Sequence, residues 1–216
     1  MSQGRTDPEA APALLPAPEG WAAALETVGR QGHAHLDLLD GEGCRHLLAA
    51  CAGLSYRVAR PLVGTAGREV RQDFELTMEI PQPHPLRALA VALEAAVGAA
   101  AAGLRPNPLP EGLVFNDLIV QRYHRGSRGI TPHRDHLRYT GLVVLVTLVG
   151  SADFFVCADR SGAQAVSLPA RPGRAILLAA PGFAGGRERP FHFVSAVREP
   201  RISLGIRQDS RPGEPT

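Results

Sequence analysis

The feature that most constrains the fold is a series of short apolar segments, rich in β-branched residues, that fills the second half of the chain. Seven segments of strand length follow Leu113, and turns containing glycine, proline or serine separate them. They are 114–123, 141–148, 153–158, 164–168, 174–179, 191–197 and 201–207. Strands this short and this evenly spaced predict an antiparallel sandwich or barrel.

The first half of the chain has helical periodicity. Asp40 can cap a helix in which apolar residues recur from Cys44 to Cys51, and a second helix with a leucine stripe starts after Pro85. Residues 74–80 alternate between apolar and polar, which predicts a half-buried strand. Helices that precede the strands would pack on one face of the sheet. The predicted fold class is therefore α+β, a β-barrel core with N-terminal supporting helices.

Charge and cysteine content exclude several classes of protein. The 23 basic and 21 acidic residues give a net charge of +2, too balanced for a general polyanion binder. Three cysteines form no closed disulfide set and no zinc pattern, which favours a reducing cytoplasm. No segment reaches the roughly 20 apolar residues of a membrane span, and the N-terminus does not resemble a secretory signal.

Composition also suggests the domain organisation. Residues 1–19 are rich in proline, alanine and glutamate and are predicted to be a flexible leader. Residues 20–209 are expected to form a single domain, with helical support and a substrate lid in 20–112 and the barrel core in 113–209. Residues 210–216 read as a polar C-terminal tail.

The most informative motif is His133-Arg-Asp135, which follows a glycine-rich turn. On an extended backbone, residues i and i+2 project to the same face, so the imidazole and the carboxylate could bind one cation. His192, at the start of a later strand, is the best candidate for a third ligand. Two histidines and one carboxylate that leave open positions are typical of non-haem Fe(II) oxygenases.

The last predicted strand carries a second signal. Its alternation places Arg201, Ser203 and Arg207 on one face. An arginine that faces the inside of a small barrel is costly unless it binds an anion, and its planar fork suits a carboxylate. Two such arginines beside a metal fit a dicarboxylate co-substrate.

These residues resemble the Fe(II)/2-oxoglutarate-dependent dioxygenases, and most closely their AlkB-like branch. The resemblance covers about residues 116–208 and depends on the order Gln121-x-Tyr123, His133-x-Asp135, His192, Arg201-x-Ser203 and Arg207. It implies a double-stranded β-helix of the jelly-roll, cupin-like type. AlkB-like proteins commonly have asparagine where Gln121 and Ser203 stand here.

The resemblance also implies roles. His133, Asp135 and His192 would be both the catalytic residues and the Fe(II) ligands. The 2-oxoglutarate site would contain Arg201 at the distal carboxylate with Ser203 assisting, Arg207 near the metal-chelating end, and Tyr123 as a hydrogen-bond donor, with Gln121 beside it. The cofactors would be Fe(II), 2-oxoglutarate and O2.

Substrate contacts are expected from the lid and the barrel mouth. Arg68 and Arg71 belong to a basic segment where AlkB-like proteins have a nucleotide lid, and His136, Arg138 and Tyr139 directly follow the metal motif. Basic side chains there could contact phosphates, but a solvated surface explains them equally. Aromatic residues are only 5% of the chain, which leaves few stacking platforms for a flipped base and favours a small molecule.

The predicted function is hydroxylation or oxidative demethylation of a small molecule, coupled to conversion of 2-oxoglutarate to succinate and CO2. One alternative is an AlkB-type demethylase of alkylated nucleic-acid bases. A cupin-like zinc hydrolase or isomerase has no need for the two inward arginines. A non-catalytic jelly-roll metal-binding or sensing module would not need all three metal ligands. No partner protein and no membrane association are indicated.

Overall fold

The computed structural model describes residues 10–211. Within that range the helices are α1 (Pro18–Gln31), α2 (Gly41–Cys51), α3 (Pro85–Ala102) and the 3-10 turn η1 (Phe183–Gly185). The strands are β1 (His33–Asp37), β2 (Arg57–Val58), β3 (Leu62–Val63), β4 (Val70–Asp73), β5 (Glu75–Thr77), β6 (Asp117–Tyr123), β7 (Gly129–His133), β8 (Tyr139–Val149), β9 (Asp153–Cys157), β10 (Val166–Leu168), β11 (Arg174–Ala179), β12 (Phe191–Ser195) and β13 (Arg201–Asp209).

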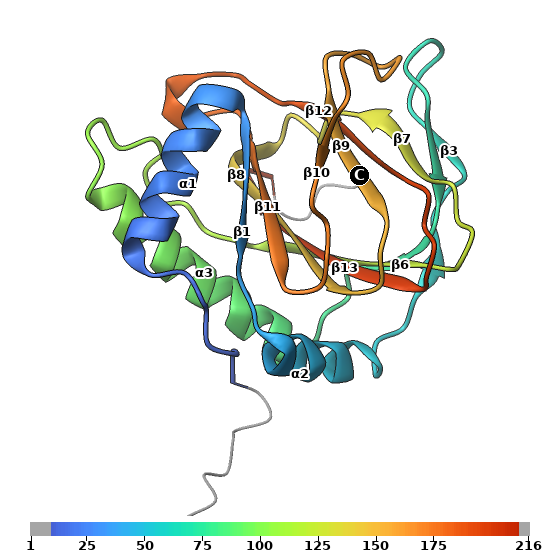
Figure 1. The fold of residues 1–216 in the computed structure, drawn as a ribbon, viewed down its shortest axis with the longest axis horizontal. Helices are drawn as coiled ribbons and strands as arrows, with labels where there is room; N and C mark the ends of the chain where they lie inside the picture. Colours follow the sequence, from blue (N-terminus) through green and yellow to red (C-terminus); the bar gives the residue numbers. More distant parts are fainter. Residues whose placement is uncertain (1–9, 212–216) are drawn as a thin grey trace, which may run out of the picture.

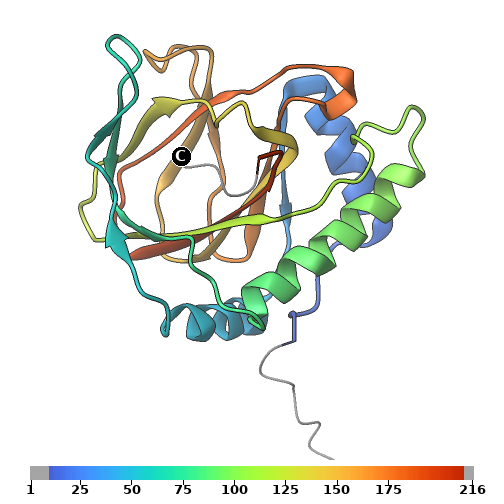
Figure 2. The ribbon, with the colours of Figure 1, turned by 180° about the vertical axis from the view of Figure 1, so that it is seen from behind.

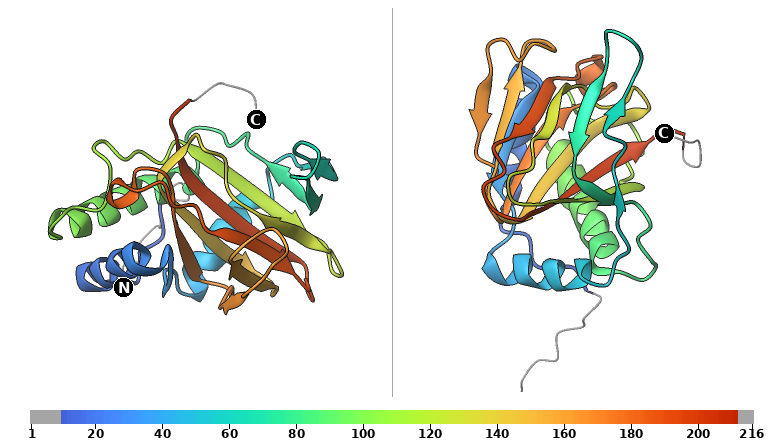
Figure 3. Two further views of the ribbon diagram at one scale, coloured as in Figure 1. Left: turned by 90° about the horizontal axis from the view of Figure 1, so that it is seen from above. Right: turned by 90° about the vertical axis from the view of Figure 1, so that its right-hand side faces the viewer.

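The strands form two antiparallel sheets that face each other. The major sheet has the order β1-β11-β8-β13-β6-β5-β2, and the minor sheet has the order β10-β9-β12-β7-β4-β3. The three helices cover the outer face of the major sheet, as the views from the front and from behind show (Figures 1 and 2). Seen from above, the two sheets form the walls of an open roll (Figure 3). The predicted α+β double-stranded β-helix with supporting helices is confirmed.

Capping residues explain where the helices begin. The Asp40 carboxylate accepts a hydrogen bond from the Gly43 amide at 2.7 Å and so starts α2, as the sequence predicts. Proline occupies the first turn of α1 and of α3, where its missing N–H costs nothing. Gly32 ends α1 with φ +77°, a conformation that glycine adopts without strain.

Two apolar layers hold the fold together. One lies between the helices and the major sheet, where α3 buries its leucine stripe (Leu86, Leu89, Leu93 and Val97) against α1, α2 and the sheet. The other lies between the two sheets and lines the inside of the roll. α3 is also the one helix among the described residues that is long and apolar enough to cross a membrane by composition. In this fold the apolar stripe of α3 is buried in the hydrophobic core.

A β-bulge in β7 orients the metal-binding motif. His133 pairs with His192 and Ile130 pairs with Val194, so Thr131 and Pro132 lie opposite the single residue Phe193. The extra residue allows Ile130 and His133 both to face the inside of the roll. Proline removes one ladder donor and is tolerated at such a bulge. The bulge therefore sets the direction of the His133 side chain.

Replacing Gly129 with alanine is expected to destabilise the protein by about 2–4 kcal/mol. Gly129 has φ +76°, and a Cβ there would collide with the carbonyl oxygen of Val194 across the β7–β12 pair. Gly126→Ala is the matched control, because Gly126 has φ +81° but a Cβ at this position would meet no atom within 4 Å. We expect it to cost about 1–2 kcal/mol, from backbone strain alone. Equal free energies of unfolding in urea for the two variants would contradict this account.

Some sequence expectations differ from the structure. The strand predicted over 74–80 is paired only over Glu75–Thr77, because the chain turns at Met78, whose carbonyl accepts from the Ile80 amide. α1 begins at Pro18, two residues before the predicted domain start. The domain divisions stay predictions. Residues 1–9 of the predicted leader and 212–216 of the predicted tail lie outside the described residues.

Candidate metal centre and co-substrate pocket

Three side chains from two strands and one loop meet inside the roll. His133 ends β7, Asp135 follows it by two residues, and His192 is the second residue of the neighbouring β12. One potential ligand atom from each lies within 4.8 Å of the others, and the two imidazole centroids are 4.3 Å apart. The side chains that the sequence singled out from distant segments are thus in one cluster, and their spacing fits a single metal ion.

Hydrogen bonds fix which nitrogen of each histidine is free. His133 Nδ1 lies 3.0 Å from the Thr131 carbonyl oxygen, and His192 Nδ1 lies 3.2 Å from the Pro190 carbonyl oxygen. A carbonyl only accepts, so Nδ1 must carry the proton in both rings. In a neutral imidazole this leaves the Nε2 lone pair available, which is the form that binds a metal.

The electrostatics of the cluster favour neutral histidines and an ionised carboxylate. Burial lowers the pKa of His133 to about 3, and the neighbouring charge of His192 adds to that effect. Burial also lowers the pKa of His192. Burial alone would raise the pKa of Asp135, but the interactions with its basic neighbours, first of all the charge of Arg207, outweigh it and leave this pKa below its ordinary value. Two neutral imidazoles and one carboxylate are therefore presented together at neutral pH.

The metal-free protein is expected to lose stability as the pH falls below about 6.5. An unfolded histidine takes up a proton near that pH, whereas His133, with a pKa of about 3, resists protonation until much lower pH. The contribution of His133 to the free energy of unfolding is fully present above about pH 6.5. It decreases as the pH falls from there to about 3, by up to about 1.4 kcal/mol per pH unit. Urea unfolding of the wild type and of His133→Ala at several pH values measures it. The same dependence of the unfolding free energy on pH in the two proteins would contradict the prediction.

A buried arginine faces the same interior. Arg201 is 3% exposed, and it donates to Ser203 Oγ at 3.0 Å and to Thr147 Oγ1 at 3.1 Å. Its Nε has no hydrogen-bond partner, and within residues 10–211 no carboxylate lies within 4 Å of it. A guanidinium with only hydroxyl partners is not neutralised, which is costly in a protein interior. The surroundings of Arg201 therefore favour an external anion.

The walls of this pocket come from β6, β8 and β13. Strand pairing places Tyr123 opposite Arg201, and both Gln121 and Thr147 opposite Ser203. The Arg201 Cζ lies 5.2 Å from the centroid of the Tyr123 ring. Burial raises the pKa of Tyr123 to about 12, so its hydroxyl remains a donor. The five residues together offer one cation and several polar groups to a ligand carboxylate.

Arg207 lies between the pocket and the metal-binding carboxylate. Its Nη2 is 3.7 Å from Asp135 Oδ1, and its Nη1 is 3.4 Å from Asp117 Oδ2. A side chain at Gly205 would meet this guanidinium, since a Cβ there lies 3.1 Å from Arg207 Nη2. Asp117, directly across the β6–β13 pair, thus anchors the arginine that holds Asp135 in place.

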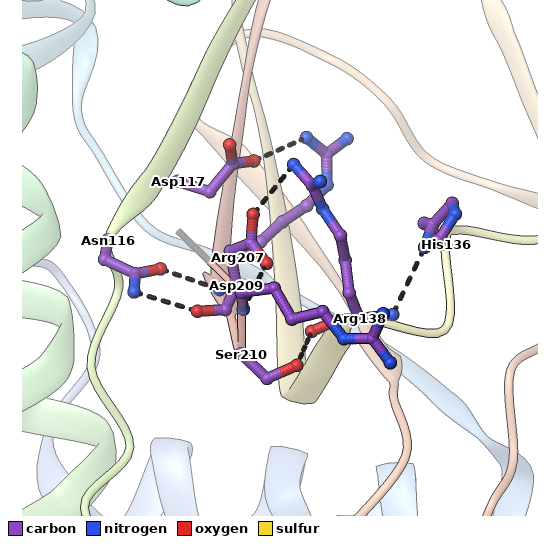
Figure 4. A network of polar contacts seen from close by, with 8 residues as sticks. Asn116, Asp117, His136, Arg138, Arg207, Asp209 and Ser210 are labelled. Carbon is purple, nitrogen blue, oxygen red and sulfur yellow. Dashed lines mark hydrogen bonds and ion pairs between the residues drawn. The ribbon is translucent and has the colours of Figure 1, made fainter. Parts of the chain in front are cut away.

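A second buried ion pair secures the loop after the metal motif. Arg138 and Asp209 are 7% and 5% exposed and pair at 2.8 Å (Figure 4). Asn116 binds both the carbonyl and the amide of Asp209, and Ser210 donates to the Arg138 carbonyl through its amide and its hydroxyl. Because removing one partner of a buried pair is costly, this network holds the end of β13 against the loop.

The remaining sequence-predicted site residues are divided between interior and surface. Arg138 and Tyr139 are buried, with Arg138 bound to Asp209. Arg68, Arg71 and His136 are exposed. The Arg71 amide donates to Thr131 Oγ1 at the base of the β3–β4 hairpin. The substrate roles of all five stay predictions.

Sequence reasoning missed Thr147, Asp117 and Asp209. Thr147 is the one hydroxyl in the apolar run 142–149, and this irregularity was a usable signal. The two aspartates carried no local signal, because each acquires its arginine partner through a strand pairing or a loop contact far away in sequence.

Comparisons with known proteins support the fold. The sequence matches no family model and no curated protein. Among solved structures, a 2OG-Fe(II) oxygenase family protein from Burkholderia pseudomallei is 18% identical, with 92% of each chain covered and a TM-score of 0.58. The chain has the fold of the 2OG-Fe(II) oxygenases.

Other structures with this oxygenase fold come from several branches. A Pseudomonas putida prolyl-4-hydroxylase is 17% identical, covering 88% of this chain and 98% of its own, with a TM-score of 0.61. OsALKBH1 is also 17% identical, covering 82% and 98%, with a TM-score of 0.55. The predicted superfamily fold is confirmed, and the AlkB-like branch is one of several that share it.

Proposed function

We propose that the protein is a 2-oxoglutarate-dependent Fe(II) oxygenase that hydroxylates or oxidatively demethylates its substrate, with 2-oxoglutarate converted to succinate and CO2. The observation that carries the proposal is the presence of two sites inside one roll, one on each sheet. His133, Asp135 and His192 form a metal-binding set, and Arg201 is a buried cation without a carboxylate partner among the described residues. A zinc hydrolase would need the first site and would have no use for the second.

The donor set fits the implied groups. His133, Asp135 and His192 would hold Fe(II), which supplies the activation of O2 that drives oxidative decarboxylation and substrate oxidation. Arg201 would bind the far carboxylate of 2-oxoglutarate through its planar fork, with the Ser203 and Thr147 hydroxyls alongside. Tyr123 would donate a further hydrogen bond. Arg207 keeps the Asp135 carboxylate oriented.

Apolar side chains also line the interior beside the site. The apolar residues between the sheets include Val143, Phe154, Val156, Ile176 and Leu178, all at most 5% exposed. Phe154 stacks on the His192 ring with centroids 5.7 Å apart. Apolar surroundings strengthen the electrostatic contacts of the charged groups beside them. The stacking of Phe154 also limits the orientations of the His192 ring.

The proposed substrate is a small molecule, with an alkylated nucleic-acid base as the second candidate. The low aromatic content supports the former, because few rings are placed to stack an extruded base. The exposed Arg68 and Arg71, which belong to the segment that contains β3 and β4, support the latter. Cytoplasmic location stays a prediction.

The test has two steps. Anaerobic addition of Fe(II) and 2-oxoglutarate to the purified protein should give a weak visible charge-transfer band, and admission of O2 should then release succinate. Tight zinc binding with no band would favour a hydrolase. A band without succinate, across a panel of metabolites and methylated oligonucleotides, would favour a sensing module. Succinate release that only oligonucleotides stimulate, and that salt suppresses, would select the nucleic-acid substrate.

A further inference from the structure

Two arginines pack on one phenylalanine at the edge of the metal site, and a third arginine lies near one of them. Arg134 Cζ lies 4.2 Å from the centroid of the Phe191 ring, and Arg160 Cζ lies 5.7 Å from it. Arg189 lies two residues before Phe191 and donates a hydrogen bond to the main-chain oxygen of Asp135. We call Arg134, Arg160, Arg189 and Phe191 the Phe191 cluster.

No ion pair neutralises the Phe191 cluster. Within the described part of the chain, no carboxylate oxygen lies within 4 Å of its three guanidinium groups. Burial lowers the pKa of Arg189 and the nearby charge of Arg134 lowers it further, and together they outweigh the opposing charge of Asp135, which is not in ion-pair contact. By contrast, Arg174 and Arg198 on other surfaces are each paired with an aspartate at 2.8 Å. Cations held close together without an acid form a site that an anion would stabilise.

The arginines of the cluster are also held in place. The Phe191 ring lies within cation–π distance of two of them, and Arg160 donates to the Arg68 carbonyl at 3.3 Å. This last bond joins the hairpin between β9 and β10 to the hairpin between β3 and β4, and both hairpins stand at the same end of the roll (Figures 1 and 3). Side chains restrained before binding lose less entropy when a ligand arrives.

The cluster borders the metal site. Arg134 lies between the ligands His133 and Asp135 in sequence, and Phe191 precedes the ligand His192. Along β12, Phe191 faces away from the interior while His192 faces inward, and Arg134 packs on the outward-facing Phe191 ring. An anion bound by the cluster would therefore lie at the outer rim beside the metal site and would be separate from the Arg201 pocket.

We propose that the Phe191 cluster binds an oxyanion group, a phosphate or a carboxylate, of the primary substrate. This inference rests on the proposed function and narrows its substrate class to anionic molecules. A guanidinium binds such groups through two parallel N–H donors, and three of them around one anion would restrict its position.

The test uses inorganic phosphate as the probe and isothermal titration calorimetry of the full chain. Arg134→Gln and Arg160→Gln should each weaken phosphate binding about tenfold, the loss expected for one charge-assisted contact. Arg45→Gln, an exposed arginine on α2, is the matched control and should bind as the wild type does. Arg134 and Arg160 are both exposed, so their variants are expected to fold, which thermal unfolding checks.

Each titration is repeated with 2-oxoglutarate and Zn(II) in excess, so that the Arg201 pocket is filled. If 2-oxoglutarate prevents phosphate from binding, the phosphate was bound at Arg201. That result would overturn the inference. Unchanged binding by Arg134→Gln and Arg160→Gln also overturns it. Because the assay needs no turnover, a failure here is distinguishable from a failure of the oxygenase proposal, which an absence of succinate would reveal.

The source of the anion is resolved by comparing a nucleoside monophosphate with short single-stranded DNA. If both bind with similar affinity and both lose it in Arg134→Gln, the cluster takes the phosphate of a small molecule. If only the DNA binds, with affinity that falls steeply with salt and depends on Arg134, the cluster takes a nucleic-acid backbone. If neither ligand depends on Arg134, the inference is wrong.

Discussion

Arg201→Gln is expected to raise the KM for 2-oxoglutarate by about a hundredfold or more, with a much smaller change in kcat at saturation. The reason is the loss of a bidentate, charge-assisted contact whose two hydrogen bonds are each worth about 1.5–3 kcal/mol. Glutamine also leaves the interior uncharged, so the variant is not expected to be less stable than the wild type. Initial rates of succinate formation against 2-oxoglutarate concentration measure the effect.

Thr147→Val provides a graded version of the same experiment. It removes only the hydroxyl that Arg201 Nη2 contacts at 3.1 Å, so we expect a rise in KM of about tenfold or less. Thr140→Val, on the same strand, is the control and should leave the KM unchanged. An unaltered KM in Arg201→Gln would remove this arginine from the co-substrate site.

The second large effect is on metal binding. His133→Ala should weaken binding of Fe(II), or of Co(II) as a stable substitute, by more than about a hundredfold, and it should abolish succinate release. Losing an outer-shell partner alone typically costs about 10–100-fold in affinity, so losing a ligand costs more. Calorimetric titration of the metal-free protein gives the affinity. Retained circular dichroism establishes that the fold is intact.

Two further variants sharpen this test. Asp135→Asn keeps the size of the side chain and removes the charge that Arg207 and the metal share, so it should weaken metal binding comparably. His124→Ala removes an exposed histidine earlier in the chain and should bind metal normally. Normal Co(II) affinity in both His133→Ala and Asp135→Asn would contradict the assigned centre.

Local patterns in the sequence were sufficient for most of the fold. Each of the seven predicted strands corresponds to an observed one, because alternation and turn residues are local properties. β7 lies in what the sequence presents as a glycine-rich turn, since Gly129 and Pro132 interrupt any alternation. Its strand character comes from pairing with β12 and β4, which no local pattern reveals. The strands β1, β2, β3 and β4 were missed as well.

The candidate site was predictable to the extent that each residue type implied its own chemistry. An inward arginine on β13 implied an anion, and H-x-D with a distant histidine implied a metal. What supports these groups was not predictable, because Asp117 and Thr147 contact Arg207 and Arg201 only after β6 and β8 take their places beside β13. The buried ion pair between Arg138 and Asp209 was not predictable either, because the two residues are far apart in the sequence.

The most direct test is a crystal structure of the protein grown without O2 in the presence of Mn(II) and 2-oxoglutarate. We predict one metal ion bound by His133 Nε2, Asp135 and His192 Nε2, and one 2-oxoglutarate whose far carboxylate is paired with Arg201. A metal ion bound elsewhere, a His192 ring turned away from it, or an Arg201 that contacts no carboxylate would contradict the account.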